Sequence, residues 1–232
     1  MKKAFDISVI IPVFDGEAFL AEAIESVLGQ TSKPFEIIVV DDGSTDRGSQ
    51  IVKKHGGRVR YIYQANQGTA AARNSGVQAA SGNYLAFLDQ DDIWLPQKLA
   101  VQSNRMKEDD RLDMSFGLIN QRYENETSRK HEREMIYRGY SPSTLLIKRE
   151  SFEDVGLFET RWCLGEWANW YIRALEKKMK HFMVEEVVAI RRIHRRNKGI
   201  LYQSYLMEYP ELLKESLDRK RKMNNNNDSQ DE

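Results

Sequence analysis

The sequence predicts an α/β fold in which helices flank a mostly parallel sheet. Three observations predict it. Short, β-branched apolar runs alternate with segments of helical spacing over the first hundred residues, and polar residues follow each of those runs. The chain, at 232 residues, is long enough to bury one large core without disulfides or metal clusters. Alternation of strand and helix requires crossover connections, which are typical of parallel sheets.

The apolar runs define the expected strands, and the helical segments lie between them. Strands are predicted at residues 7–11, 35–40, 59–63 and 84–88, whose composition suits positions buried on both faces of a sheet. Helices are predicted at residues 17–29, from about 46 to 55, and at 68–80. The later part predicts strands at 114–119, 145–147 and 187–190, helices at 149–155 and 164–179, and an exposed loop at 122–134.

Composition and charge exclude several classes of protein. The 35 Lys and Arg residues balance 35 Asp and Glu residues, which argues against a nucleic-acid partner. A single cysteine, Cys163, excludes an intrachain disulfide and a multi-cysteine metal site, and we expect it to be a packed thiol. No apolar run approaches the roughly 18–20 residues that span a bilayer, and Asp6 and Pro12 interrupt any signal-like core. We therefore expect a cytoplasmic protein without a transmembrane segment.

Polar segments follow the first four predicted strands, at the edge where parallel sheets bind ligands. They are residues 12–16, 41–44, 64–68 and 89–92. Neither the dinucleotide-binding nor the P-loop glycine pattern is present in the sequence. A nucleotide at this edge would therefore be held through carboxylates and a metal ion.

The segment Asp89-Gln90-Asp91-Asp92 is the strongest local signal. Three carboxylates within four residues repel one another unless a cation lies between them. Their oxygen atoms suit Mg²⁺ or Mn²⁺, which in turn bind phosphate oxygens. The alternative is a solvated acidic turn in which Asp91 or Asp92 caps the next helix.

Three further residues each allow a structural and a functional interpretation. Asp41 and Asp42 either cap the following helix or form a turn with Gly43, or they accept hydrogen bonds from a base or a ribose. Arg73 lies among small residues directly after a strand end, so it either is a surface charge or reaches a phosphate.

Taken together, four segments resemble the beginning of family 2 glycosyltransferases, which have the Rossmann-like GT-A fold. The segments are residues 8–17, 38–46, 66–76 and 88–96, and a weaker resemblance extends to about residue 198. The resemblance implies metal-assisted transfer of a hexosyl group, with inversion, from a nucleoside-diphosphate-sugar. We expect the donor to be UDP-linked and the metal to be Mn²⁺ or Mg²⁺.

The resemblance also implies roles for individual residues. Asp42 would contact the nucleotide base, with Pro12 and Phe14 nearby, and Arg73 would lie close to the nucleotide. Asp91 would hold the metal, and Asp89 the ribose or the sugar. The metal would stabilise the charge that develops on the leaving diphosphate.

The expected catalytic base is where the sequence departs from the family pattern. Family members have a Glu-Asp pair at the start of a helix, but here Trp167 follows Glu166 and Asn169 stands where another Asp is common. Trp cannot accept a proton and neutral Asn is a poor base, so Glu166 is the candidate base. The alternatives are that Glu166 only favours the helix dipole, or that the chain is a non-catalytic nucleotide-sugar-binding homologue acting as a partner or regulatory subunit.

Aromatic residues surround this position. Trp162, Trp167, Trp170 and Tyr171 either belong to the core or shape an acceptor pocket.

A basic segment, residues 191–198, follows the last predicted strand. Family members have an Arg- and His-containing segment here, so the resemblance implies that Arg192 binds the nucleotide-sugar and that His194 binds the metal. The alternatives are a structural histidine and arginines that are surface charges.

The chain organisation expected is one domain over residues 1–199, with a nucleotide-sugar half at 1–112 and an acceptor half at 113–199. We expect residues 200–222 to form an amphipathic helical segment that is interrupted at Pro210. We expect residues 223–232 to be a disordered tail. The helical segment either packs back on the domain or makes a peripheral contact with the inner face of a membrane. The acceptor is not identified by the sequence: a glycan, a lipid-linked glycan and a peptide are all open.

Overall fold

The computed structural model describes residues 5–123 and 135–228. The described strands form one nine-stranded sheet in the order β3-β2-β1-β4-β8-β6-β9-β5, with β7 paired to β6. The strands are β1 (Ile7–Val13), β2 (Glu36–Asp41), β3 (Arg60–Tyr63), β4 (Tyr84–Phe87), β5 (Ile93–Trp94), β6 (Met114–Tyr123), β7 (Met135–Gly139), β8 (Leu146–Lys148) and β9 (His181–Ile193). The helices are α1 (Leu20–Leu28), α2 (Gly48–Lys53), α3 (Thr69–Ala79), α4 (Lys98–Glu108), α5 (Arg149–Val155), α6 (Glu166–Glu176), α7 (Lys198–Leu201) and α8 (Glu208–Asp228). Short 3₁₀ turns are η1 (Gly56–Arg58), η2 (Pro142–Thr144) and η3 (Gln203–Met207).

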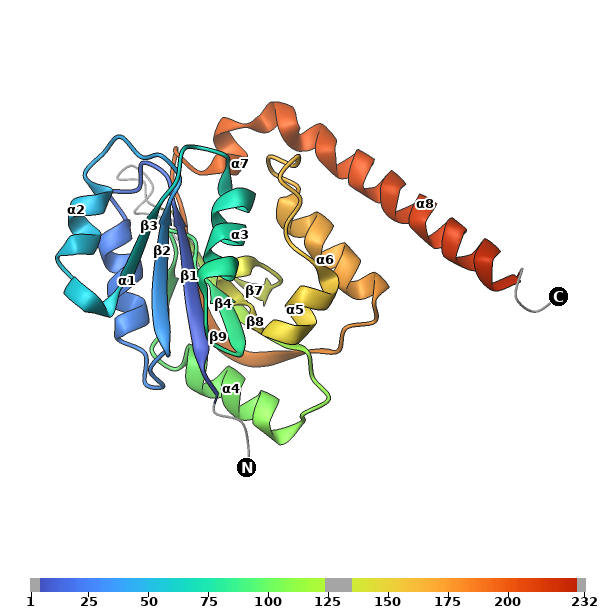
Figure 1. Cartoon of the computed structure of the whole chain (residues 1–232), viewed down its shortest axis with the longest axis horizontal. Helices are drawn as coiled ribbons and strands as arrows, with labels where there is room; N and C mark the ends of the chain where they lie inside the picture. The colour runs from blue at the N-terminus through green and yellow to red at the C-terminus, as the bar shows by residue number, and fades with distance from the viewer. Residues whose placement is uncertain (1–4, 124–134, 229–232) are drawn as a thin grey trace.

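The first four strands are parallel, as the sequence predicts. β1 pairs in parallel with β2 and with β4, and β2 pairs in parallel with β3. Alternate residues of β1 point to opposite faces, so Val9 and Ile11 pack with α1 and α4, whereas Ile10 packs toward α3 and α5. Figure 1 shows these helices covering the two faces of the sheet. The α/β fold class is therefore confirmed.

The second half of the sheet is mixed. β8 is antiparallel to both β4 and β6, and β9 is parallel to β6 before it meets β5 in antiparallel pairing. The pair Ile93 with Ile190 places the end of β9 beside the segment that follows β4. This pairing brings the basic segment at 191–198 to the acidic segment at 89–92.

The C-terminal helix differs from its predicted limits. α8 begins at Glu208 and continues to Asp228, past the predicted start of a disordered tail at 223. Pro210 lies in the first turn of α8, where proline is tolerated because the amide hydrogen has no partner within the helix, so it does not interrupt the helix. Once a helix is formed, each added residue gains a backbone hydrogen bond for the conformational entropy it loses, so α8 can continue past residue 222. Residues 124–134 of the predicted exposed loop lie outside the described residues.

Contacts with α6 and the loop before it hold α8 against the domain. Leu212 is buried, and Ser216 and Arg219 contact the carboxylate of Glu176 at 2.6 and 2.8 Å. The carboxylate of Glu208 accepts hydrogen bonds from three successive backbone amides at residues 163–165. These contacts place the first turns of α8 against the domain. Across the described ranges, no helix is both long and apolar enough to cross a bilayer.

Candidate functional site

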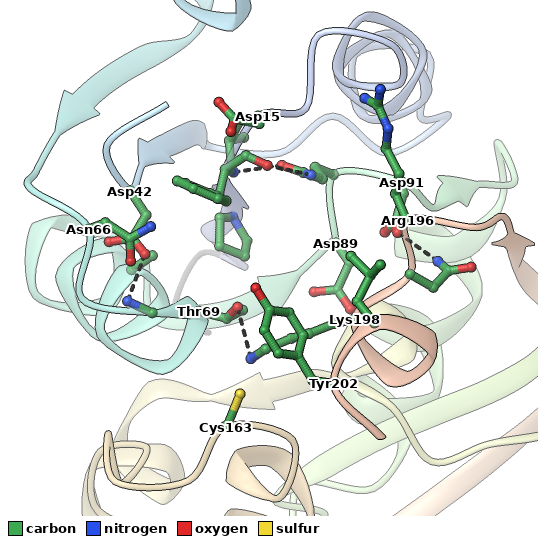
Figure 2. A pocket seen from close by; sticks show the side chains of 18 of the residues that line it. Asp15, Asp42, Asn66, Thr69, Asp89, Asp91, Cys163, Arg196, Lys198 and Tyr202 are labelled. Carbon is green, nitrogen blue, oxygen red and sulfur yellow. Dashed lines mark hydrogen bonds between the residues drawn. The ribbon is translucent and has the colours of Figure 1, made fainter. Parts of the chain in front are cut away.

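A cavity of about 1010 Å³ opens at the carboxyl ends of β1, β2 and β4. Its lining combines the ends of these strands, the loop before α6, and the segment after β9 (Figure 2). The predicted site residues that line it are Pro12, Phe14, Asp42, Asp89, Asp91 and His194. Arg73, Glu166 and Arg192 are not part of this lining.

Asp41 and Asp42 have different environments although they are adjacent. Asp41 accepts a hydrogen bond of 2.5 Å from the hydroxyl of Tyr61, and burial beside this carboxylate raises the pKa of that tyrosine. Asp42 lines the cavity and accepts three hydrogen bonds: from the backbone amides of Gln67 and Gly68 at 2.9 and 2.7 Å, and from the Gln64 side-chain amide at 2.7 Å. Asp42 therefore fixes the loop that leads into α3, and a carboxylate with about four acceptor sites can still accept one further bond.

Gln90, the second residue of the acidic segment 89–92, connects it to the end of β1. Its side-chain amide accepts a hydrogen bond from the Phe14 backbone amide at 2.8 Å and donates one to the Phe14 carbonyl at 3.0 Å. Phe14 is 44% exposed and lines the cavity. Gln90 thus holds an exposed ring at the cavity wall, a role that the sequence did not indicate.

Arg73 lies in a buried ion-pair network behind the cavity. Its guanidinium contacts Asp89 Oδ1 at 2.6 Å and Glu166 Oε1 at 3.3 Å. Burial alone would lower the pKa of Arg73, but the negative charges of Asp89 and Glu166 raise it overall. Lys198 Nζ completes the network at 3.6 Å from Glu166 and also contacts Thr69 at 3.3 Å. Arg73 is therefore a buried cation that positions Asp89, and not a surface charge.

Asp91 and His194 meet at the side of the cavity. His194 Nε2 lies 3.1 Å from Asp91 Oδ2, and the amide of Asn197 contacts the same oxygen at 2.9 Å. The imidazole also stacks on the ring of Phe19, with 4.4 Å between centroids. A carboxylate and an imidazole are suitable ligands for Mn²⁺. Within residues 5–123 and 135–228, no cluster of three His, Cys, Asp or Glu side chains could hold a metal alone. A metal here would therefore need oxygen atoms from a bound ligand or water.

Asp92, the third acid of the segment, is buried, and its side chain contacts other residues of the protein. It is 6% exposed and accepts a hydrogen bond of 2.7 Å from the Ser143 hydroxyl. Burial, together with the charges of Asp91 and Asp89, raises the pKa of Asp92. The three acids of one short motif thus have three environments, and the sequence carried no signal for Ser143.

The structure does not bring Arg192 to the cavity, where the sequence analysis expected it. Its side chain is 5% exposed and pairs with Glu22 of α1, and its Nε donates to the Asp91 carbonyl. Neighbouring residues of a strand point to opposite sides, so Arg191 lines the cavity instead. Arg196 and Lys198 also line it, as does Asn197, which sequence reasoning did not identify. The basic segment therefore faces the cavity through residues other than Arg192.

The aromatic residues near Glu166 are divided between core and cavity. Trp162 lines the cavity, whereas Trp167 stacks on Trp170 and Tyr171 at 5.6 and 5.7 Å between centroids. The indole of Trp167 donates to the Tyr140 carbonyl at 2.8 Å. The position that holds an Asp in the family pattern is therefore filled by a packed aromatic residue.

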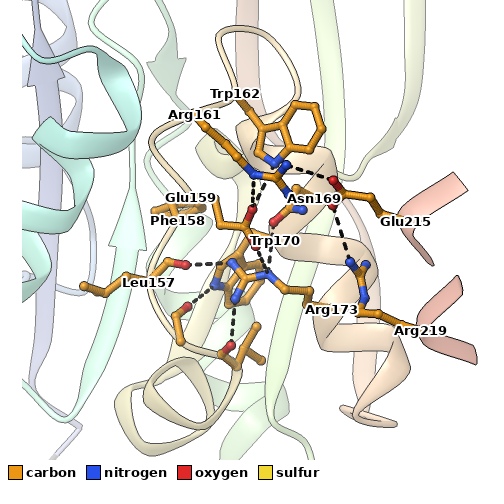
Figure 3. A network of polar contacts seen from close by, with 12 residues as sticks. Leu157, Phe158, Glu159, Arg161, Trp162, Asn169, Trp170, Arg173, Glu215 and Arg219 are labelled. Atoms are coloured by element: carbon orange, nitrogen blue, oxygen red, sulfur yellow. Dashed lines mark hydrogen bonds and ion pairs between the residues drawn. The ribbon is translucent and has the colours of Figure 1, made fainter. Parts of the chain in front are cut away.

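Asn169 and Arg173 hold the loop before α6 (Figure 3). Arg173 donates to the Asn169 side chain at 3.0 Å and to the carbonyls of Val155 and Leu157 at 2.9 and 2.6 Å. These contacts tie α6 to the end of α5. The side chain that replaces the second family Asp is thus engaged in the packing of this loop.

The chain is similar to proteins of a known family. The family model for Glycosyl transferase family 2 matches residues 8–179. An uncharacterized glycosyltransferase of Rickettsia prowazekii is 34% identical over 169 residues, which are 66% of this chain and 53% of that protein. Glycosyltransferase GlyA of Streptococcus pneumoniae is 46% identical over 94 residues, which are 39% of this chain and 13% of that protein. The chain thus spans about half or less of the length of the curated relatives that it matches.

Solved structures show the same architecture. Crystal structures of S. aureus TarS 1–349 in complex with UDP and with UDP-GlcNAc each match with a TM-score of 0.68 and 21% sequence identity. They cover 82% of this chain, and 61% and 59% of those chains. The fold is that of the GT-A glycosyltransferases. The chain belongs to glycosyltransferase family 2.

Proposed function

We propose that this chain transfers a hexosyl group, with inversion, from a UDP-linked donor to a hydroxyl acceptor. The observation that carries the proposal is the contact between Asp91 and His194, at 3.1 Å on the side of a cavity built at the carboxyl ends of parallel strands. Family membership and the TarS complexes with UDP and UDP-GlcNAc support the choice of donor.

The nucleotide would lie at the β1 and β2 ends of the cavity. Asp42 has acceptor capacity left for a base N–H or a ribose hydroxyl, and the Phe14 ring offers a flat apolar surface for the base. Asp89, which Arg73 fixes from behind, would accept a hydrogen bond from the ribose or the sugar. These contacts would orient the donor before any bond changes.

Asp91 and His194 would hold a divalent metal, Mn²⁺ or Mg²⁺, whose other ligands would be diphosphate oxygens and water. Such a metal would stabilise negative charge on the departing diphosphate. The chain itself supplies positive charge at the same wall through Arg191, Arg196 and Lys198.

Glu166 is the carboxylate that we propose as the base. Within the described part of the chain, its Oε2 has no hydrogen-bond partner, while Oε1 faces Arg73 and Lys198. As the acceptor oxygen bonds to the anomeric carbon and the bond to the diphosphate breaks, the hydroxyl proton would pass to this oxygen. Glu166 is 6% exposed, so the partly exposed Lys198 side chain would have to move aside to admit the acceptor.

The test is release of UDP from UDP-sugars in the presence of MnCl₂, with donor binding measured in parallel by calorimetry. Wild-type protein is expected to bind the donor only with metal and to release UDP. Asp91→Asn should abolish metal-dependent binding, whereas Asp110→Asn, at an exposed position, should behave as wild type. Binding without hydrolysis or transfer to any acceptor extract would instead support a non-catalytic nucleotide-sugar-binding partner.

A further inference from the structure

An exposed apolar surface begins at the mouth of the cavity and continues along α8. We call it the α7–α8 surface. Its apolar members are Leu201, Tyr202, Tyr205, Leu206, Met207, Tyr209, Leu213 and Leu217, of which Met207 is 74%, Leu213 61% and Leu217 54% exposed. Soluble proteins leave apolar side chains exposed singly, and contiguous groups mark sites of contact with another molecule.

Helix geometry explains why this face is left uncovered. Tyr209, Leu213 and Leu217 follow one another at intervals of four residues, so they form one stripe along α8. Leu212 and Ser216, each one position earlier than a member of the stripe, are buried against the domain. The two sets lie about 100° apart around the helix, so the contacts that hold α8 to α6 leave Leu213 and Leu217 uncovered. Tyr209 is 41% exposed, and its hydroxyl lies 3.5 Å from the Leu164 carbonyl. Figure 1 shows α8 extending beyond α6.

Basic side chains border the stripe. By the same geometry Lys220 lies on one side of Leu213 and Leu217, and Lys214 and Arg221 lie on the other; all three are exposed. The acids Glu208 and Glu215 point inward, to residues 163–165 and to Arg161. Glu211 lies farther around the helix, as does Asp218, which contacts Arg221 at 3.5 Å. The outward face is therefore apolar with a net positive border.

We propose that the α7–α8 surface binds the interface of an anionic lipid bilayer. An amphipathic helix of this composition lies in the plane of the interface, with Leu, Tyr and Met among the acyl chains and Lys and Arg at the lipid phosphates. A second copy of the chain fits less well, because a two-fold contact pairs this face with itself and would bring the Lys and Arg side chains of the two copies together. This orientation would present the cavity mouth, through Leu201, Tyr202 and Tyr205, to the membrane surface.

The experiment is sedimentation of the full chain with vesicles of phosphatidylcholine alone or mixed with phosphatidylglycerol. Binding is expected to the mixed vesicles and to weaken as salt rises. The double variant Leu213→Glu with Leu217→Glu should lower the affinity about tenfold or more, because two apolar side chains no longer enter the interface. Lys214→Gln with Lys220→Gln should reduce the preference for anionic lipid. Both pairs are exposed and lie outside the cavity, so circular dichroism and UDP release in solution should not change.

Phe35→Glu is the matched control. Phe35 is 58% exposed and directly precedes β2, at the opposite end of the strands from the cavity, so its variant should bind vesicles as wild type does. Equal binding to both vesicles, or binding that the leucine variants retain, would overturn the proposal. Self-association without lipid that the leucine variants abolish would overturn it in favour of a second copy.

Discussion

His194 Nε2 lies 3.1 Å from Asp91 Oδ2, although 103 residues separate the two side chains in the sequence. The long strand β9 makes this contact possible, because its last residues pass β5 in antiparallel pairing and continue beside the segment that follows β4. Asn197 contacts the same carboxylate oxygen and the carbonyl of Arg192. The two candidate metal ligands are thus positioned by the sheet and by a neighbouring amide.

Replacement of His194 should weaken metal binding without loss of the fold. His194→Ala is expected to lower the affinity for Mn²⁺ in the presence of UDP about tenfold or more, since loss of even a hydrogen-bond partner of a metal ligand typically costs about 10- to 100-fold. Electron paramagnetic resonance of free Mn²⁺ measures this affinity directly and does not depend on turnover. The control is His55→Ala, whose imidazole contacts Glu25 at 3.4 Å, away from the cavity. An unchanged affinity in His194→Ala would assign this histidine a structural role.

Glu166→Gln should separate catalysis from donor binding. Removal of a general base is expected to reduce kcat about 10²- to 10⁴-fold, while the affinity for the donor changes little because Asp42, Asp89 and Asp91 are intact. The measurement is UDP release at saturating donor, beside calorimetric binding. Arg73 retains its contact with Asp89 at 2.6 Å, so the variant should fold. A kcat within a few-fold of wild type would mean that Glu166 only balances the charges of Arg73 and Lys198.

The gathering of acidic side chains at one edge of the sheet could be predicted from the sequence, because these residues follow β2 and β4, which both pair with β1. Asp42, Asp89 and Asp91 each lie within a few residues of a buried, β-branched run, and the carboxyl ends of parallel strands meet at one edge. No long-range information is needed for that inference. The same reasoning could not distinguish Asp41 from Asp42, because the difference depends on Tyr61 of the neighbouring strand.

The residues at the end of β9 were predicted less well for a physical reason. The identity of the residue that faces the cavity depends on strand register, and a shift of one residue exchanges Arg191 with Arg192. The pairing of β9 with β6 contains register irregularities, which the sequence pattern does not reveal. The exposed stripe of α8 was likewise not predictable in detail, since it depends on which side of the helix meets α6.

Gly43 should be sensitive to replacement because it requires a left-handed backbone. Its φ is +83°, and a Cβ there would lie 2.8 Å from the backbone nitrogen of Asn66. Gly43→Ala is expected to lower the free energy of unfolding by about 1–3 kcal/mol and to weaken donor binding, because the loop that Asp42 holds must shift. Urea unfolding and donor calorimetry measure the two effects. Gly57→Ala is the control: a Cβ at Gly57 meets nothing within 4 Å, so both quantities should stay close to wild type.

Lys98 should make the stability of the protein depend on pH in the alkaline range. Its ammonium is fully buried, contacts the neutral Gln102 Oε1 at 2.7 Å and lies 4.3 Å from the centroid of the Trp94 ring. Burial lowers the pKa of Lys98 well below 10.5. Between that lowered pKa and 10.5, the unfolded chain binds one proton more than the folded chain, so the free energy of unfolding rises with pH, by up to about 1.4 kcal/mol per pH unit.

Lys98→Met tests this dependence, because methionine fills a similar volume without a charge. Urea unfolding at several pH values from 7 to 10 should show a gain in stability for wild type that is absent or smaller in the variant. Titration of other groups contributes to both proteins and cancels in the difference between them. Lys54→Met, at an exposed position, should keep the wild-type dependence because its ammonium is hydrated in both states. Parallel curves for wild type and Lys98→Met would show that Lys98 stays protonated in the folded protein throughout this range.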